Sequence, residues 1–434
     1  MVARLSTSDP DFADRLNALL AARGAGEANV GEAVAKILAD VKARGDAAVV
    51  EYTQRFDRVT LAPSALRVRS DELIAAEKAA PAKAVAALKL AADRISDYHR
   101  RLLPKDIEWT DGVGVTLGAR FTPLAAVGVY VPGGRAAYPS SVLMNALPAK
   151  LAGVSRTVMA VPAPDGHINP LVLVAAKLAG VDEIYRIGGA QAVAALAFGT
   201  ATIRPVDKIV GPGNAYVAAA KRQVFGVVGI DTIAGPSEIL VVADGANDPD
   251  WIAADLLSQA EHDENAQSIL VTDDAAFATA VESAVESALK TLPRAAIAGE
   301  SWRRFGAIIL TRSLDEAPEI VDRIAPEHVE IATADPALLA KRIRNAGALF
   351  LGRYTPEAVG DYVAGPNHVL PTSGAARFSS GLSVTDFLKR TSVIACDADG
   401  LRAIGPAAMT LADAEGLDAH GLSVGIRLNV GRDD

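Results

Sequence analysis

The sequence predicts an α/β protein with two parallel sheets in tandem. Short β-branched runs alternate with longer helical stretches, first from about residue 127 and again from residue 236. Strands that alternate with helices in this way favour parallel sheets covered by helices on both faces. Half of the 434 residues are hydrophobic, which is enough for a large core in each part.

Each series of candidate strands can be followed along the chain. The first series consists of "VGVYVPGG", "RTVMAVPAP", "DEIYRIGG" and "VDKIVGPG", and helical stretches such as "AQAVAALAFG" separate them. The second consists of "PSEILVVAD", "SILVTD", "GAIILT", "HVEIAT" and "ALFLG". Residues before about 104 show mainly helical periodicity, and residues after about 382 predict a smaller, mixed appendage.

Composition narrows the classes of partner and compartment. The formal net charge is −9 and no basic stripe is present, so nucleic acid and anionic membranes are poor candidate partners. The N-terminus lacks the apolar stretch of a signal peptide, and no apolar run is long enough to span a bilayer. We therefore expect a cytoplasmic protein without membrane contact.

Two glycine turns are candidate phosphate sites. Gly211, Gly213 and Asn214 stand between a strand and a helix, and "IGGAQA" with Gln191 has the same setting. Helix N-termini expose unpaired N–H groups that suit a phosphate. Neither stretch matches a dinucleotide or P-loop fingerprint, so a plain tight turn remains an open interpretation of each. Two such turns in consecutive units make a dinucleotide a reasonable ligand.

Glu327 and His328 are a candidate acid–base pair. They follow Pro326, where a helix cannot continue and a strand begins. A carboxyl beside an imidazole at the end of a sheet offers two groups for proton transfer. A solvated edge with no catalytic role is the alternative that the pattern alone leaves open.

Four polar residues far apart in the sequence are candidate metal ligands. Gln259 and His262 lie three residues apart, so on a helix they would project from one face. If they met Asp361 and His420, the nitrogen and oxygen donors would suit zinc better than calcium. Spacing alone does not show that the four converge, and surface or core histidines remain the simpler interpretation.

Cys396 is the one cysteine of the chain, so no disulfide can form within a single copy. It follows the β-branched run "TSVIA" and has no histidine or basic neighbour. We expect a buried structural thiol rather than a nucleophile.

Many ordered blocks resemble one enzyme family. "GVYVPGGRAAYPSSVLMNALPAKLAGV", "KIVGPGNAYVAAAKR", "AGPSEILVVAD", "LLSQAEHDENAQ", "APEHVEI", "GRYTPEAVGDYVAGPNHVLPT" and "AEGLDAHGLSV" are similar to the histidinol dehydrogenases, from about residue 25 to the end. The resemblance implies oxidation of L-histidinol to L-histidine, the last two steps of histidine biosynthesis. It also implies two successive hydride transfers to two NAD molecules, with one zinc ion per subunit.

The resemblance assigns roles residue by residue. Zinc ligands are implied at Gln259, His262, Asp361 and His420, and the acid–base pair at Glu327 and His328. Substrate contacts are implied at Ser237, Gln259, His262, His328, Asp361, Glu415 and His420. Cofactor contacts are implied at Tyr130, Gln191 and Asn214, in an incomplete Rossmann-like domain.

The resemblance also implies a domain plan and a partner. Residues 1–24 would form an N-terminal helical arm, 25–127 and 236–381 one catalytic α/β domain, and 128–235 the NAD-binding domain. Residues 382–434 would form a C-terminal dimerisation segment. In the implied intertwined homodimer, Glu415 and His420 serve the active site of the other copy.

Three rival functions differ in what they require. A dehydrogenase on the same scaffold that oxidises another small alcohol, such as a sulfonated propanediol, would keep the zinc and NAD residues. A two-lobed solute-binding protein would need an export signal and has no use for the Glu327–His328 pair. A thiol-dependent aldehyde dehydrogenase would need an activated cysteine, which the surroundings of Cys396 disfavour.

Overall fold

The fold contains the two predicted parallel sheets. The computed structural model describes residues 2–22, 30–133, 138–233 and 235–429. A six-stranded sheet has the order β1 (Ala3–Ser6), β11 (Ala307–Leu310), β10 (Gln267–Thr272), β9 (Glu238–Ala243), β12 (His328–Ala332) and β13 (Ala348–Leu351). A five-stranded sheet has the order β6 (Glu183–Tyr185), β5 (Arg156–Ala160), β4 (Ala126–Tyr130), β7 (Lys208–Val210) and β8 (Gly229–Ile230). All strand pairs in both sheets are parallel.

Helices cover both faces of the six-stranded sheet, because its strands are apolar on both sides. One face carries α10 (Pro249–Ala260), α11 (Ala275–Ala288) and α12 (Ala295–Phe305). The other carries α1 (Phe12–Ala21), α13 (Ala317–Ile324) and α14 (Pro336–Ala340). The first strand differs from the predicted N-terminal helical arm, since Ala3–Ser6 pairs with β11 at the edge of this sheet.

The five-stranded sheet is covered in the same manner. α4 (Ser70–Ala79), α5 (Ala82–Arg101), α6 (Pro139–Leu151) and α7 (Pro170–Leu178) share one apolar core with it. α2 (Gly31–Arg44), α3 (Asp46–Asp57), α8 (Gly189–Phe198) and α9 (Ala215–Val224) share the other.

The helices of residues 31–101 therefore lie on a different sheet from the one we expected. The domain plan grouped residues 25–127 with the six-stranded sheet. Instead α2 buries Val34, Ile37 and Val41 in the core that also holds α8 and α9. We propose a revised division, with residues 30–101 belonging to the same domain as the five-stranded sheet.

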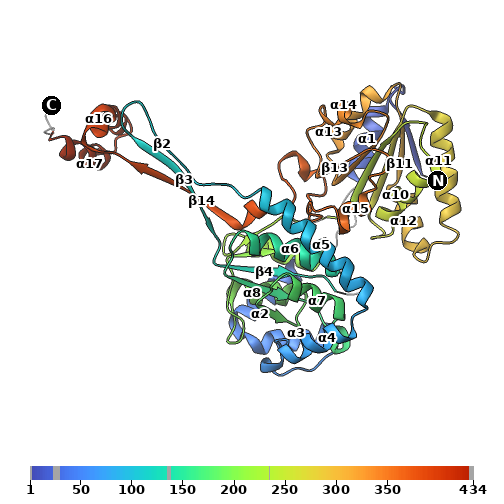
Figure 1. The fold of residues 1–434 in the computed structure, drawn as a ribbon, viewed down its shortest axis with the longest axis horizontal. Helices are drawn as coiled ribbons and strands as arrows, with labels where there is room; N and C mark the ends of the chain where they lie inside the picture. Colours follow the sequence, from blue (N-terminus) through green and yellow to red (C-terminus); the bar gives the residue numbers. More distant parts are fainter. Residues whose placement is uncertain (1, 23–29, 134–137, 234, 430–434) are drawn as a thin grey trace.

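A third, antiparallel sheet forms an arm. β14 (Leu388–Ala395), β3 (Thr116–Pro123) and β2 (Ile107–Thr110) make a ribbon that ends in the helix pair α16 (Ala398–Ala414) and α17 (Asp418–Leu428). The arm extends away from both parallel sheets (Figure 1). Cys396 follows β14 and is exposed, so the expectation of a buried thiol is wrong.

None of the helices in the described ranges is long and apolar enough to cross a membrane.

Candidate active site

The predicted acid–base pair lies at the start of β12, one strand in from the β13 edge of the six-stranded sheet. His328 is the first residue of β12, between β9 and β13, and Glu327 directly precedes it. Both side chains are buried, with 6% of Glu327 and 3% of His328 exposed. Ligands of α/β sheets usually bind at the carboxyl ends of the strands, whereas this pair lies at the amino ends. Because both side chains are buried, a solvent-exposed sheet edge is excluded as the setting of these two groups.

The backbone of Glu238 fixes the orientation of both groups. The Nδ1 atom of His328 lies 2.9 Å from the Glu238 carbonyl oxygen. A carbonyl oxygen can only accept, so Nδ1 carries the hydrogen and Nε2 keeps its lone pair. The Glu238 N–H donates to Oε2 of Glu327 at 3.1 Å. One residue at the start of β9 thus sets the imidazole tautomer and holds the carboxyl group.

Burial shifts the protonation of this pair in opposite directions. Burial raises the pKa of Glu327 well above its usual value, and the neighbouring carboxylates of Glu238, Asp361 and Glu357 add to the rise. Burial lowers the pKa of His328 to about 4, so the imidazole is neutral near pH 7. A neutral imidazole with a free Nε2 lone pair can accept a proton or bind a metal ion.

Two carboxylates face the free nitrogen of His328. Both come from α15 (Glu357–Tyr362), where a spacing of four residues puts them on one helix face. Oε1 of Glu357 lies 3.7 Å from Nε2, and Oδ1 of Asp361 lies 3.9 Å from it. Burial raises the pKa of Glu357 to about 8 and that of Asp361 to about 6. Two buried carboxyl groups beside each other are costly to ionise without a cation.

Gln259 and His262 come from the end of α10. The helix follows β9 and runs back across the sheet, so its last turn returns to the amino ends of the strands. Gln259 is 1% exposed, and neither of its amide atoms has a hydrogen-bond partner in the described parts of the chain. His262 lies in the turn after the helix and is exposed. Its charge is among the influences on the pKa of Glu357 and of His328, after burial.

The donor set fits a divalent metal ion. One atom each of His328, Glu357 and Asp361 lie within 4.8 Å of one another. Nε2 of His328, Oε1 of Glu357 and both amide atoms of Gln259 are buried without a hydrogen-bond partner in the described residues. Buried polar atoms are normally paired, so these orphaned atoms indicate a missing ligand. A mixture of imidazole nitrogen and carboxylate oxygen suits zinc.

Two of the predicted residues lie elsewhere in the chain. Glu415 is the C-cap of α16 and His420 belongs to α17, and both are exposed on the arm. The arm and the six-stranded sheet lie at opposite ends of the molecule (Figure 1). One chain alone therefore does not bring His420 to Asp361. Ser237 is half-buried directly before Glu238, next to the acid–base pair in the sequence.

Two residues near this cluster had no assigned role. Glu357 precedes Asp361 by four positions in "PEAVGDY", and that helical spacing could have identified it. The other is His368, in the stretch "GPNHVLP". Its Nδ1 lies 3.0 Å from the Asp361 carbonyl oxygen, and its Nε2 lies 3.3 Å from Oγ of Ser141 on α6. His368 therefore connects the cluster to a helix of the five-stranded sheet.

The predicted cofactor residues lie at the carboxyl edge of the five-stranded sheet. Tyr130 ends β4, Gln191 lies in the first turn of α8 after β6, and Asn214 is the N-cap of α9 after β7. The strand order reverses between β4 and β7, and such switch points are where open α/β sheets bind nucleotides. The tyrosine hydroxyl accepts a hydrogen bond from the Gly189 N–H at 3.0 Å. The position of this edge agrees with a dinucleotide ligand.

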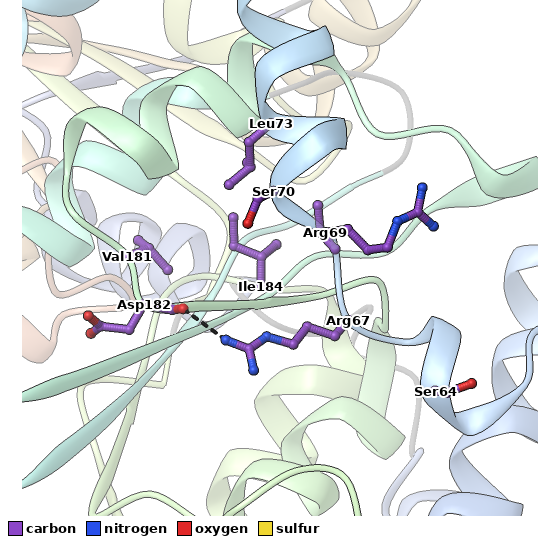
Figure 2. A pocket seen from close by; sticks show the side chains of 9 residues that line it. Ser64, Arg67, Arg69, Ser70, Leu73, Val181, Asp182 and Ile184 are labelled. Carbon is purple, nitrogen blue, oxygen red and sulfur yellow. Dashed lines mark hydrogen bonds between the residues drawn. The ribbon is translucent and has the colours of Figure 1, made fainter.

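A pocket on the described surface contains none of these residues. It measures about 350 Å³ and lies beside the start of β6, at the opposite edge of the five-stranded sheet. Figure 2 shows Arg67 reaching the Asp182 carbonyl oxygen across it, at 3.3 Å. Arg69 points outward and pairs with Asp71 at 2.8 Å. Its arginines already have partners and no buried polar atom of its lining lacks one, so we assign it no chemistry.

A family model, two relatives and a solved structure that match this chain all carry the same family description. A family model described as histidinol dehydrogenase matches residues 21–428. Histidinol dehydrogenase of Rhodospirillum rubrum is 65% identical over 432 residues, which covers 99% of this chain and 100% of that protein. Histidinol dehydrogenase of Brucella suis is 61% identical over 430 residues, with 99% and 100% covered. The crystal structure of histidinol dehydrogenase from Elizabethkingia anophelis has a TM-score of 0.94 at 36% identity, covering 99% of this chain and 98% of that one.

Proposed function

Because the chain belongs to the histidinol dehydrogenase family, we propose that it oxidises L-histidinol through L-histidinal to L-histidine. It does so with two molecules of NAD and with bound zinc, in the last two steps of histidine biosynthesis. The observation that carries the proposal is the family match over residues 21–428, since it includes the whole buried cluster at the amino edge of the six-stranded sheet. We propose that it carries out this biosynthetic role in the cytoplasm.

The residues that would hold the zinc and the NAD are those that the sequence predicts. Gln259, His262 and Asp361, together with His420 of a second copy, would hold the zinc. Tyr130, Gln191 and Asn214 would hold the NAD. When bound, the zinc orients the nitrogen atoms of the substrate and the NAD accepts a hydride in each oxidation. Orientation of this kind can supply up to roughly 7–11 kcal/mol of the reduction in barrier. The orphaned amide atoms of Gln259 support a metal ion here, and the orphaned Nε2 of His328 is left free to take a proton.

His328 acts as the base of the first oxidation. Its Nε2 atom takes the hydroxyl proton of the alcohol while the carbinol hydride leaves. Support comes from the Nδ1 hydrogen bond to Glu238, which leaves Nε2 unprotonated, and from burial, which keeps the imidazole neutral. A positioned base of this type contributes roughly 10²–10⁴-fold to the rate.

Glu327 acts in the second oxidation. It takes a proton from the water that adds to the aldehyde, so that the hydrate can lose the second hydride. Burial raises the pKa of its carboxyl group, which makes the ionised form a stronger base. The hydrogen bond from the Glu238 N–H supports its carboxylate in that form.

A second copy of the chain completes the site. We propose an intertwined homodimer in which Glu415 and His420 of one copy reach the cluster of the other. Large apolar side chains are exposed on the arm, which supports its burial against a partner. They are Ile107, Trp109, Ile394, Leu411 and Ile426, each more than half exposed.

A dehydrogenase of another small alcohol on this scaffold is not favoured, because the relatives that are 61–65% identical are histidinol dehydrogenases. A thiol-dependent aldehyde dehydrogenase is disfavoured because Cys396 lies exposed on the arm.

The test compares two substrates. NADH formation by the purified full chain with zinc is measured with L-histidinol and with sulfopropanediol. We expect a much higher kcat/KM for L-histidinol, because a carboxylate such as Glu415 attracts an amine and repels a sulfonate. A higher kcat/KM for the sulfonate would overturn the substrate assignment while leaving the scaffold and cofactors in place.

A further inference from the structure

A buried ion pair lies behind the glycine turn that follows β7. Lys221 of α9 pairs with Asp231, which directly follows β8. Each side chain is only 3% exposed. Burial raises the pKa of Asp231, and the charge of Lys221 opposes that rise. Neither residue belongs to the predicted site, and neither takes part in the proposed chemistry.

The two side chains of this ion pair form hydrogen bonds with both the N–H and the carbonyl oxygen of Gly211. The Gly211 N–H donates to Oδ2 of Asp231 at 2.7 Å, and Nζ of Lys221 donates to the Gly211 carbonyl oxygen at 3.0 Å. Nζ also donates to the carbonyl oxygen of Thr232 at 3.1 Å. The turn is therefore bound at its first residue to α9 and to the segment that leaves the domain.

The backbone at Gly211 admits only glycine. Its φ is +112°, and an added Cβ would collide with the carbonyl oxygen of Tyr130. The turn thus lies directly on the backbone at the end of β4. The hydroxyl of the same tyrosine accepts the N–H of Gly189 in the other glycine turn. A continuous set of contacts connects the ion pair to both turns at the strand-order switch point.

A buried ion pair adds little net stability, because the loss of hydration offsets most of the attraction between the charges. Its effect here is geometric, since a charged donor and a charged acceptor hold one peptide unit from two sides. We propose that Lys221 and Asp231 are positioning residues for NAD binding, which set the conformation of the Gly211–Asn214 turn. This inference rests on the proposed function, which places the dinucleotide at that turn.

The experiment removes one charge and measures NAD binding apart from turnover. Lys221→Met keeps most of the length of the side chain and removes its charge and donors. We expect the dissociation constant and the KM for NAD to rise roughly tenfold or more, with bound zinc per chain and kcat at saturating NAD nearly unchanged. Asp231→Asn keeps an oxygen that can accept the Gly211 N–H, so a smaller rise is expected.

The matched control is another ion pair of the same domain. Nε of Arg156 lies 2.8 Å from Glu183, with the side chains 14% and 10% exposed. This pair joins the starts of β5 and β6, at the opposite edge of the sheet. Arg156→Met should lower the melting temperature without changing the dissociation constant for NAD. If Lys221→Met lowered the affinity for NAD only by destabilising the whole domain, Arg156→Met should lower that affinity as well.

An unchanged dissociation constant for NAD in Lys221→Met, or an equal rise in Arg156→Met, would overturn the inference. If Lys221→Met does not fold, Asp231→Asn decides between the same outcomes. Calorimetric titration with NAD alone needs no turnover. Failure of the proposed function would instead appear as wild-type protein that forms no NADH from L-histidinol.

Discussion

At the scale of single residues, one hydrogen bond determines what His328 can do. Because Nδ1 donates to the carbonyl oxygen of Glu238, the lone pair of Nε2 faces Glu357 and Asp361. Such a second partner fixes the tautomer of a catalytic or metal-binding histidine. The sequence predicts the pair of Glu327 and His328 from the Pro-terminated helix before it. It does not predict the tautomer, since the acceptor lies 90 positions away.

The first prediction separates the two oxidations. Glu327→Gln keeps the shape of the side chain and removes its basicity, so the water-dependent second step loses its base. We expect turnover of L-histidinal to fall by roughly 10²–10⁴-fold and the oxidation of L-histidinol to fall less. NADH formation is measured with each compound as the starting substrate. An equal loss for both would contradict the assignment of Glu327.

A second prediction concerns His99, which is buried on α5. Neither ring nitrogen has a hydrogen-bond partner in the described chain, and burial lowers its pKa to about 4. The imidazole of His99 therefore takes up a proton near pH 6.5 in the unfolded chain, but only near pH 4 in the folded chain. The contribution to stability is full above about pH 6.5 and is lost as the pH falls toward 4, at up to about 1.4 kcal/mol per pH unit.

His99→Leu should remove this part of the pH dependence. We expect the free energy of unfolding to decrease between pH 7 and pH 5. The decrease in His99→Leu should be about 2 kcal/mol smaller than the decrease in the wild type. Denaturant titrations at the two pH values measure it. His167→Asn, which changes an exposed histidine, is the control and should behave as the wild type. If His99→Leu and the wild type lose stability equally, His99 is not buried as a neutral group.

At the scale of elements, the catalytic pair depends on how closely β13 approaches β12. The Gly347 N–H donates to the carbonyl oxygen of Pro326 at 3.1 Å, and the Ala348 N–H donates to that of Glu327 at 2.9 Å. A Cβ at Gly347 would collide with the Glu327 carbonyl oxygen. Because Gly347 has no side chain, β13 can pair closely with the start of β12, where the acid–base pair lies.

Gly347→Ala should therefore displace Glu327 and His328. We expect stability to fall by about 1–3 kcal/mol, as is usual for an overpacked site. We also expect kcat to fall roughly tenfold, because small misplacements of catalytic groups are costly. Gly299→Ala on α12 is the matched control, since its Cβ would meet only Leu289 at 3.8 Å. A normal kcat in Gly347→Ala would show that this approach does not position the pair.

The sequence predicts where strands and helices lie better than it predicts which of them pack together. Alternating strand and helix periods identify both parallel sheets. The strand Ala3–Ser6 is missed because four residues with one buried side chain carry no clear period. The helices of residues 31–101 are assigned to the other sheet because an amphipathic helix shows that it has an apolar face, but not which sheet covers that face.

At the scale of the whole molecule, the arm explains why four predicted ligands do not meet in one chain. Gln259 and Asp361 lie at the six-stranded sheet, whereas His420 lies on the arm at the other end (Figure 1). Spacing in the sequence cannot show which residues converge, and still less which copy supplies them. The exposed apolar side chains of the arm are the feature that points to a second copy.

A complementation experiment tests the shared site. His328→Asn and His420→Asn chains should each be inactive alone. In a mixed dimer, the intact cluster of one chain would meet the intact His420 of the other, so equal co-expression should restore about a quarter of wild-type activity. Separately tagged chains allow the mixed dimer to be isolated. A mixed dimer without activity would contradict the exchange of the arms.

Counting NADH with and without the metal tests the proposed reaction most directly. Wild-type protein is incubated with limiting L-histidinol and excess NAD, with and without a chelator. We expect two NADH per L-histidinol, none after chelation, and full recovery with added zinc. One NADH per substrate, or unchanged turnover of the metal-free protein, would contradict the proposed reaction.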